Sequence, residues 1–296
     1  MHKSAFVNII GRPNVGKSTL MNALVGERMS IITSKPQTTR HRIKGILSGD
    51  NFQLVFSDTP GFVEETHYKM HESMNKFVDS TFKDADILLF VIDKYDDYEK
   101  DSPLVQKLNR IEVPKILVIN KVDLATPEET VKLIDQWKDW VNFKEIIPIS
   151  ALNQLGTEKL LELILENTPE GPAYYPKDQL TDRSERFFIS EIIRENILQQ
   201  YKQEIPYSCE VVVDSFKEGK TSGEEEITRI EAHIYAMRQS QKPILIGKGG
   251  SAIKKLGIES RKDIEKFLDT RVHLELLVKI KDNWRNDERS LKHFGY

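Results

Sequence analysis

The sequence predicts two domains in its 296 residues: an α/β domain with a mostly parallel sheet and helices on both faces, then a smaller α+β domain. In the first, short apolar runs alternate with helical patterns, which is typical of parallel strands joined by crossover helices. A turn-rich segment with three prolines follows, and after it the order of elements changes. We therefore assign residues 1–168 to the first domain, 169–182 to a linker and 183–296 to the second domain.

The elements of the first domain follow from the spacing of its apolar residues. Short, almost continuously apolar runs indicate strands that are buried on both faces of a sheet. They lie at residues 5–10, 43–47, 52–56, 87–92, 115–119 and 146–149. Helical spacing is expected from Lys17 onward, near 102–110, near 128–141 and up to about Glu166. Strands and helices therefore alternate along this domain.

The second domain is expected to begin with a long helix that Thr181 or Asp182 caps and whose apolar residues share one face. Two strands, a helix and a third strand follow, and alternation of apolar and polar residues indicates a sheet with one exposed face. The expected elements are strands 208–216 and 228–237 with a loop at 217–223, a helix from Ala252 towards Phe267, a strand at 272–280 and a polar tail at 283–292.

Residues Gly11 to Ser18 spell Gly-x-x-x-x-Gly-Lys-Ser between the first predicted strand and a predicted helix. Glycines there let successive backbone N–H groups point at a polyphosphate, and the helix N-terminus adds a partial positive charge. Lys17 is expected to bridge the β- and γ-phosphates and Ser18 to bind Mg²⁺. The predicted phosphate-binding residues are Gly11, Asn14, Val15, Gly16, Lys17, Ser18 and Thr19.

A second motif, Asn120-Lys121-Val122-Asp123, directly follows a predicted strand and indicates a guanine site. The Asp123 carboxylate can accept hydrogen bonds from guanine N1–H and the N2 amine, a pair of donors that adenine lacks. Leaving it unpaired against ATP gives a discrimination of ~10⁴. Asn120 is expected to tie this loop to the phosphate loop, and the Lys121 stem to lie along the base. Backbone amides of Ser150, Ala151 and Leu152 are expected to reach guanine O6.

Between these motifs lie two segments that predict a switch and a magnesium site. Asp58 in Asp-Thr-Pro-Gly is expected to hold Mg²⁺ through water, and the Gly61 N–H to meet the γ-phosphate. Thr39, with Thr38 as the alternative, completes the metal shell from the polar stretch Gln37 to Arg40. The predicted metal ligands are thus Ser18, Thr39 and Asp58, and the catalytic residues are Lys17, Thr39, Gly61 and Asn14.

Hydrolysis requires a group that positions the attacking water, and here Phe62 follows Gly61 where related switches place glutamine. Phe62 cannot hydrogen-bond water, so either other groups position it or a partner assists. Asn14 is a candidate ligand for K⁺, which would act like the positive charge of an arginine finger. The alternative, which the residues leave open, is that Asn14 only stabilises the turn of the phosphate loop.

Composition indicates a soluble globular protein with a net charge of −3. One cysteine, Cys209, excludes an internal disulfide and fits a reducing cytoplasm. The longest apolar run falls short of a membrane span, and the first strand begins too early for a leader peptide. From 238 to 262, however, the sequence contains seven basic residues and one acidic residue, which gives this stretch a net charge of +6.

The basic stretch contains Gly247-Lys248-Gly249-Gly250, directly before a predicted helix. Two glycines let a nucleic-acid backbone approach closely, and the helix N-terminus and lysines attract phosphates. Together with the order of strands, this loop resembles the Gly-x-x-Gly loop of a type II KH domain. The residues expected to bind RNA are Gly247, Lys248, Gly249, Gly250, Lys254 and Lys255.

Over its full length the chain resembles the bacterial Era GTPases, which join a P-loop GTPase domain to a KH domain. The resemblance rests on GRPNVGKST, QTTRHRI, DTPG, NKVD, IGKGGSAIKKLGIESRKDIE and the ending VHLELLVKIKDNWRNDERSLKHFGY. It implies a monomeric GTP-hydrolysing switch that binds the 3′ end of 16S rRNA and assists assembly of the 30S subunit. The family also implies a cytoplasmic protein, in some members associated with the inner face of the cell membrane.

One alternative function remains open from the residues themselves. A regulatory GTPase with the same first domain would use its second domain to bind protein or membrane partners instead of RNA. The acidic run Glu224 to Glu226 and the polar tail would suit either role. A metabolic enzyme acting on GTP is disfavoured, because no catalytic pair appears beyond the switch residues.

Overall fold

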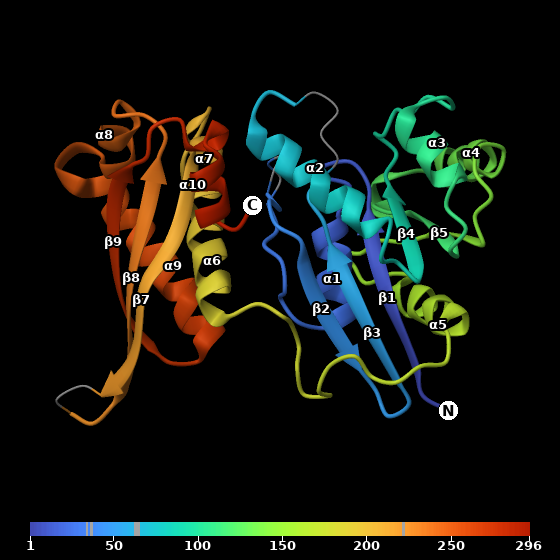
Figure 1. Ribbon diagram of the computed structural model, residues 1–296, viewed down its shortest axis with the longest axis horizontal. Helices are drawn as coiled ribbons and strands as arrows, with labels where there is room; N and C mark the ends of the chain where they lie inside the picture. Colours follow the sequence, from blue (N-terminus) through green and yellow to red (C-terminus); the bar gives the residue numbers. More distant parts are fainter. Residues whose placement is uncertain (34, 36–37, 62–65, 221–222) are drawn as a thin grey trace. The chain divides into compact units, whose positions relative to one another are not determined.

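The computed structural model describes residues 1–33, 35, 38–61, 66–220 and 223–296 (Figure 1). Contacts between residues divide the chain into two compact units. The first unit contains Met1–Glu65 and Ser73–Asp182, and the second contains Thr66–Glu72 and Arg183–Tyr296. Gln37 and Phe62, both named in the sequence analysis, lie outside the described residues.

The first unit is built on a six-stranded sheet with strand order β2-β3-β1-β4-β5-β6. Only β2 runs antiparallel to its neighbour, so the predicted mostly parallel sheet is confirmed. The central strand β4 is buried along its whole length because helices cover both faces. The strands are β1 (Lys3–Ile10), β2 (Ile43–Ser48), β3 (Phe52–Asp58), β4 (Ile87–Ile92), β5 (Lys115–Ile119) and β6 (Glu145–Pro148).

Helices lie on both faces of this sheet, and Figure 1 shows α2 in front of it and α1 behind. The helices are α1 (Lys17–Val25), α2 (Lys69–Thr81), α3 (Pro103–Asn109), α4 (Pro127–Lys138) and α5 (Thr157–Asn167), with a short turn η1 (Val122–Leu124). Leu108 of α3 and Trp137 of α4 pack into one cluster with Phe90 of β4. α4 ends earlier than expected, and α2 was not anticipated from the spacing of its residues.

The parallel strands bring the predicted motifs to one edge of the sheet. Strands β1, β3, β5 and β6 each end where a motif begins: the phosphate loop, Asp58, Asn120 and Ser150 in turn. In a sheet of this kind ligands bind at the carboxyl ends of the strands. The topology therefore collects segments that lie far apart in the sequence.

The segment predicted as a linker, 169–182, packs on the first unit. The side-chain oxygen Oε1 of buried Gln53 accepts hydrogen bonds from the backbone N–H groups of Tyr174 (2.7 Å) and Tyr175 (2.9 Å). The Tyr174 ring lies 4.6 Å from the ring of Phe6, measured between centroids. These contacts make the segment part of the first unit, in agreement with the division at Asp182.

The second unit has a three-stranded sheet with order β7-β8-β9, in which β7 and β8 are antiparallel and β8 and β9 parallel. Apolar residues of α6 and α9 cover one face, including Ile193, Ile197 and Ile264, so the predicted α+β domain is confirmed. The elements are α6 (Glu185–Gln200), α7 (Ile205–Ser208), β7 (Cys209–Lys220), β8 (Glu226–Ala236), α8 (Gln241–Ile246), η2 (Lys248–Gly250), α9 (Ser251–Leu268), β9 (Arg271–Ile280), η3 (Trp284–Asn286) and α10 (Glu288–His293).

The predicted cap of the long helix is wrong. α6 begins at Glu185 with Ser184 at its N-cap position. The two predicted capping side chains bind strand β2 instead: the Thr181 hydroxyl donates to the backbone oxygen of Lys44 (2.7 Å), and the Asp182 carboxylate pairs with the Lys44 ammonium (3.4 Å). Sequence spacing cannot distinguish a cap from a contact with a distant strand.

Two further expectations need correction in the second unit. The predicted loop at 217–223 is shorter, because β7 continues to Lys220 and pairs with β8 as far as Glu226; residues 221 and 222 are not described. The predicted polar tail is folded into η3 and α10, and Trp284 is fully buried with its ring N–H donating to the Ser208 backbone oxygen (2.9 Å). Among the described residues, none of the helices has the length and apolar character to cross a membrane.

Candidate functional site

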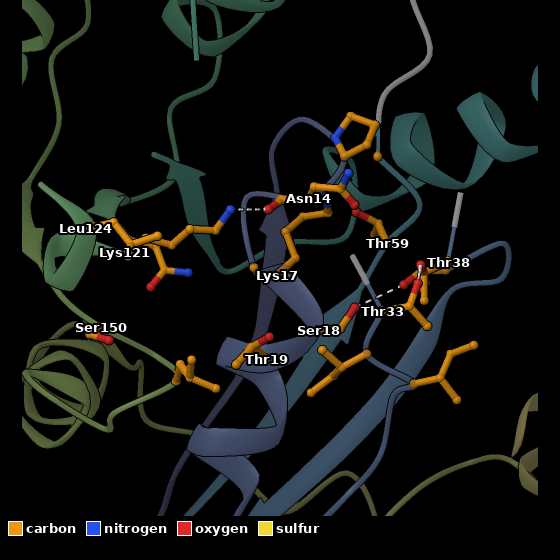
Figure 2. Close-up of a pocket in the computed structure, with 18 of the residues that line it drawn as sticks. Asn14, Lys17, Ser18, Thr19, Thr33, Thr38, Thr59, Lys121, Leu124 and Ser150 are labelled. Carbon is orange, nitrogen blue, oxygen red and sulfur yellow. Dashed lines mark hydrogen bonds between the residues drawn. The ribbon is translucent and has the colours of Figure 1, made fainter. Parts of the chain in front are cut away.

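A pocket of about 430 Å³ lies at the carboxyl edge of the first sheet (Figure 2). Most of the predicted nucleotide-binding residues line it: Asn14, Gly16, Lys17, Ser18, Thr19, Thr39, Gly61, Asn120, Lys121, Asp123, Ser150 and Leu152. The other four lie just behind it: Gly11, Val15, Asp58 and Ala151 are buried. The structure therefore brings together residues from five separate segments of the chain.

The phosphate loop and the guanine loop are joined by the side chain of Asn120. Its Nδ2 donates to the backbone oxygen of Val15 (2.8 Å), and its Oδ1 accepts from the backbone N–H of Ala151 (2.9 Å). Gly16 has a φ of 95°, and a Cβ there would lie 2.3 Å from Asn120 Nδ2. Glycine at this position thus satisfies both the turn and the close approach of Asn120.

Lys17 is held inside the phosphate loop. Its ammonium donates to the backbone oxygens of Gly11 (3.0 Å) and Arg12 (2.7 Å), and the residue is 6% exposed. Burial lowers the pKa of Lys17 to about 8, although the nearby carboxylates of Asp58 and Asp96 favour its charged form. A triphosphate beside this ammonium would stabilise the charge that burial penalises.

Three oxygen-bearing side chains converge beside the loop. The Ser18 hydroxyl donates to Asp58 Oδ2 (2.6 Å), and the Thr39 hydroxyl lies 3.3 Å from the same oxygen and 3.0 Å from Ser18 Oγ. Asp58 is fully buried, which raises its pKa, and its Oδ1 has no hydrogen-bond partner among the described residues. Hard oxygen ligands around a buried carboxylate suit Mg²⁺, so these residues fit the predicted metal.

The structure also separates the two adjacent threonines. Thr38 Oγ1 donates to the backbone oxygen of Lys35 (2.6 Å) and lies 2.6 Å from Thr33 Oγ1. Thr39, by contrast, is buried against Ser18 and Asp58. The geometry therefore favours Thr39 over Thr38 for the predicted metal site.

The base side of the pocket is formed by the loops after β5 and β6. Figure 2 shows the Lys121 side chain pointing toward Asn14, whose backbone oxygen accepts from the ammonium at 2.5 Å. The same ammonium pairs with Asp93 at 2.6 Å, so the Lys121 stem is fixed along one wall. Asp123 and Leu152 lie at the pocket rim, where Leu152 is 77% exposed.

Sequence reasoning missed several residues of this pocket. Ile31, Ile32 and Thr33 line it from the segment after α1, and Thr59 and Leu124 also contribute. The pair Ile31-Ile32 stands in an otherwise polar stretch, and this pattern could have indicated that the segment lines a pocket. Asp96, near Lys17, was also missed: burial is the main cause that raises its pKa to about 6, and the charge of Asp93 adds to the effect.

The predicted RNA-binding loop of the second unit precedes α9. Gly249 and Gly250 have φ values of 58° and 79°, and a Cβ at either position would meet no atom within 4 Å. Glycine is required there for the backbone conformation, and the space in front of the loop stays open. Lys248, Lys254 and Lys255 are exposed on this loop and the first turns of α9.

A groove of about 580 Å³ lies between α9 and β9. Lys254 lines it, together with residues that the sequence did not single out: Ile253, Ile258 and Arg261 from α9, and His273 and Leu274 from β9. Arg261 lies within the basic stretch, but its place in the groove depends on how α9 packs on β9. The groove combines the cations of Lys254 and Arg261 with apolar side chains and one carboxylate, Glu275. The cations suit phosphates and the apolar side chains suit bases.

Comparison with known proteins supports both halves of this arrangement. Residues 6–121 match a family described as 50S ribosome-binding GTPase, and residues 204–285 match the KH domain family. GTPase Era of Syntrophus aciditrophicus is 46% identical over 100% of this chain and 96% of its own length. GTPase Era of Clostridium kluyveri is 44% identical over the full length of both proteins.

Solved structures of Era share the whole fold. A variant of Aquifex aeolicus Era bound to GDP and AlF₄⁻ is 35% identical, with a TM-score of 0.92 over 99% of each chain. Era in complex with MgGDPNP and nucleotides 1506–1542 of 16S rRNA is 34% identical, with a TM-score of 0.93 over 100% of this chain and 99% of the other. The chain therefore belongs to the Era family of GTPases.

Proposed function

We propose that this protein binds and hydrolyses GTP with Mg²⁺, binds the 3′-end region of 16S rRNA through its KH domain, and assists maturation of the 30S ribosomal subunit. The observation that carries the proposal is the likeness in fold to an Era that holds both MgGDPNP and a 16S rRNA segment. In this chain the pocket of the first unit and the basic groove of the second offer matching chemistry.

In the nucleotide pocket each residue has a defined task. Asp123 selects guanine, Lys17 neutralises the phosphates, and Ser18, Thr39 and Asp58 hold the metal. Mg²⁺ bound there would stabilise negative charge on the β- and γ-phosphates as the bond to the γ-phosphate breaks. Gly61 lies against Pro13 of the phosphate loop, where a Cβ would come within 2.5 Å of the proline ring. We expect its N–H to meet the γ-phosphate.

K⁺ is the second ion in the proposal, with Asn14 as its ligand. Asn14 lines the pocket and has a φ of 67°, a conformation that asparagine tolerates better than most residues. That backbone geometry equally supports the alternative of a turn-stabilising role. Hydrolysis rates in K⁺ and Na⁺ distinguish the two: K⁺ should accelerate the wild-type protein, and Asn14→Ala should abolish the difference. Equal wild-type rates in both salts exclude the ion.

The switch is expected to couple GTP to RNA. GTP orders Thr39 and the segment from Asp58, this favours RNA binding, and hydrolysis allows release. Because such coupling is reciprocal, bound RNA should raise GTP affinity or accelerate its turnover. The test measures GTP hydrolysis with and without an oligonucleotide that matches the 16S 3′ end, and a scrambled sequence serves as control. No change, with RNA binding verified, contradicts the coupling.

The alternative is a regulatory GTPase whose second domain binds protein or membrane partners. Crosslinking and sequencing of RNA from cells separates the two functions, because a protein-binding module would recover no enriched ribosomal site. We further propose a cytoplasmic monomer, with peripheral association at the inner face of the cell membrane. Fractionation of cells and light scattering of the purified protein test these two points.

A further inference from the structure

One strand of the first sheet ends at a residue that the predicted nucleotide motifs do not include. The central strand β4 ends at Ile92 and leads directly into Asp93. Because β4 lies between the parallel strands β1 and β5, its carboxyl end lies between the phosphate loop and the guanine loop. Ligands of such sheets bind at this edge, so Asp93 stands where a residue can act on the site.

The carboxylate of Asp93 is buried, and both of its oxygens are engaged. Its side chain is 6% exposed. Oδ1 accepts a hydrogen bond from the backbone N–H of Tyr95 (2.9 Å), and Oδ2 pairs with the Lys121 ammonium (2.6 Å). The Asp93 backbone is fixed as well, because its N–H donates to the Asp96 carboxylate (3.2 Å) and its oxygen accepts from the Asp96 N–H (3.2 Å). The turn after β4 therefore holds this carboxylate in one position.

Lys121 reaches from the guanine loop to the phosphate loop. Figure 2 shows its side chain directed at Asn14, whose backbone oxygen accepts from the ammonium (2.5 Å). Lys121 and Asn14 have φ values of 60° and 67°, a backbone conformation that is unfavourable for residues with a side chain. The lysine thus joins two positions that need support from their surroundings. Asp93 supplies that support as a fixed, charge-assisted hydrogen bond.

We propose that Asp93 is a positioning residue of the guanine site, whose carboxylate holds Lys121 along the pocket wall and against the phosphate loop. The inference rests on the proposed function, because the Lys121 stem is expected to lie along the guanine base. Asp93 does not itself line the pocket, so its effect on the nucleotide passes through Lys121. Selection of guanine by Asp123 does not involve this lysine. Loss of the charge at Asp93 should therefore speed release of GDP and GTP by the same factor and leave the preference for guanine intact.

The experiment measures how fast fluorescent GDP and a fluorescent GTP analogue dissociate from the full-length protein. Asp93→Asn keeps the size of the side chain and an acceptor for the Tyr95 N–H but removes the charge. Dissociation of both nucleotides should become roughly tenfold faster, as expected for loss of a charge-assisted hydrogen bond. Competition with ATP should still show the wild-type preference for guanine. Asp79→Asn, which breaks an ion pair with Lys107 elsewhere in the first unit, is the control and should leave dissociation unchanged.

A double-variant cycle separates positioning from a merely structural role. If Asp93 acts through Lys121, Asp93→Asn should have no further effect on dissociation in a Lys121→Ala background. Effects that add overturn the inference, and so does wild-type dissociation from a folded Asp93→Asn protein. If Asp93→Asn does not fold, Asp93→Ser removes the charge with a smaller polar side chain, and the same two comparisons apply. A wild-type protein that binds no guanine nucleotide overturns the proposed function as well.

Discussion

The nucleotide pocket and the groove of the KH domain hold their polar groups in opposite ways. In the pocket, Asn120, Lys17 and Asp58 are buried and fixed by hydrogen bonds. Those of Asn120 and Asp58 reach distant parts of the chain, and those of Lys17 lie within the phosphate loop. In the groove region, Lys248 and Lys254 are exposed, with no hydrogen bond within the described part of the chain. A rigid, desolvated site selects one ligand, whereas exposed cations attract a charged strand and adapt to it.

The largest expected effect is on the preference of the pocket for GTP over ATP. Asp123→Ala should reduce the preference for GTP over ATP by ~10³–10⁴, because the paired donors of guanine lose their acceptor. Competition binding with both nucleotides measures it. Asp135→Ala, an exposed carboxylate on α4, is the control and should keep the wild-type preference. An Asp123 variant that still prefers GTP strongly would place the selectivity elsewhere.

A smaller effect is expected on the free energy of unfolding, which the charge of Asp96 near Lys17 should lower. Burial raises the pKa of Asp96 to about 6, above the ordinary value of 3.8. The stability that the folded protein keeps while Asp96 is protonated is therefore fully present below pH 4 and is lost as pH rises through 6. Asp96→Asn cannot ionise, so above pH 6 it should be more stable than wild type by about 1–3 kcal/mol.

Denaturant unfolding between pH 4 and pH 8 measures this difference. The gain from Asp96→Asn should be near zero at pH 4 and reach its full size above pH 6. Asp97→Asn, at the exposed neighbouring position, should change the free energy of unfolding by no more than about 0.5 kcal/mol. An Asp96 variant with the same gain at every pH would show that burial of the charge is not the cause.

The smallest expected effect concerns Lys248 in the glycine loop before α9. Lys248→Asp should weaken RNA binding about tenfold at every sequence and reduce the slope of log affinity against log salt by about 1. Fluorescence anisotropy with two unrelated oligonucleotides at several salt concentrations measures both. Lys266→Asp, the same charge change at an exposed position of α9 outside the groove, should have a weaker effect. Loss confined to one sequence would mean that Lys248 reads bases.

The difference between the two regions also explains what could be predicted from the sequence. The nucleotide motifs follow directly after strands, and their residue types and order depend on the ligand's own chemistry. Asn120, Asp123 and Lys17 could therefore be assigned roles without coordinates. The groove was predicted only through its glycine loop and lysines, because its floor forms where α9 packs on β9.

Other features depend on contacts that no local pattern reveals. The sequence predicts Thr181 or Asp182 as a helix cap, but the Thr181 hydroxyl donates to the backbone oxygen of Lys44 in β2. Trp284 lies in the stretch that the sequence predicts as a polar tail, yet it is buried and its ring N–H donates to the backbone oxygen of Ser208.

The segment 169–182 has a practical consequence for isolating the nucleotide-binding half. Gln53 and Phe6 lie beneath it, and the backbone N–H of Ser4 donates to the oxygen of Pro169 (3.1 Å). A fragment cut after residue 168 would expose the Phe6 ring to water and remove both donors of the Gln53 amide oxygen. Cleavage after Asp182 keeps this covering strap in place, so that fragment is the one to express.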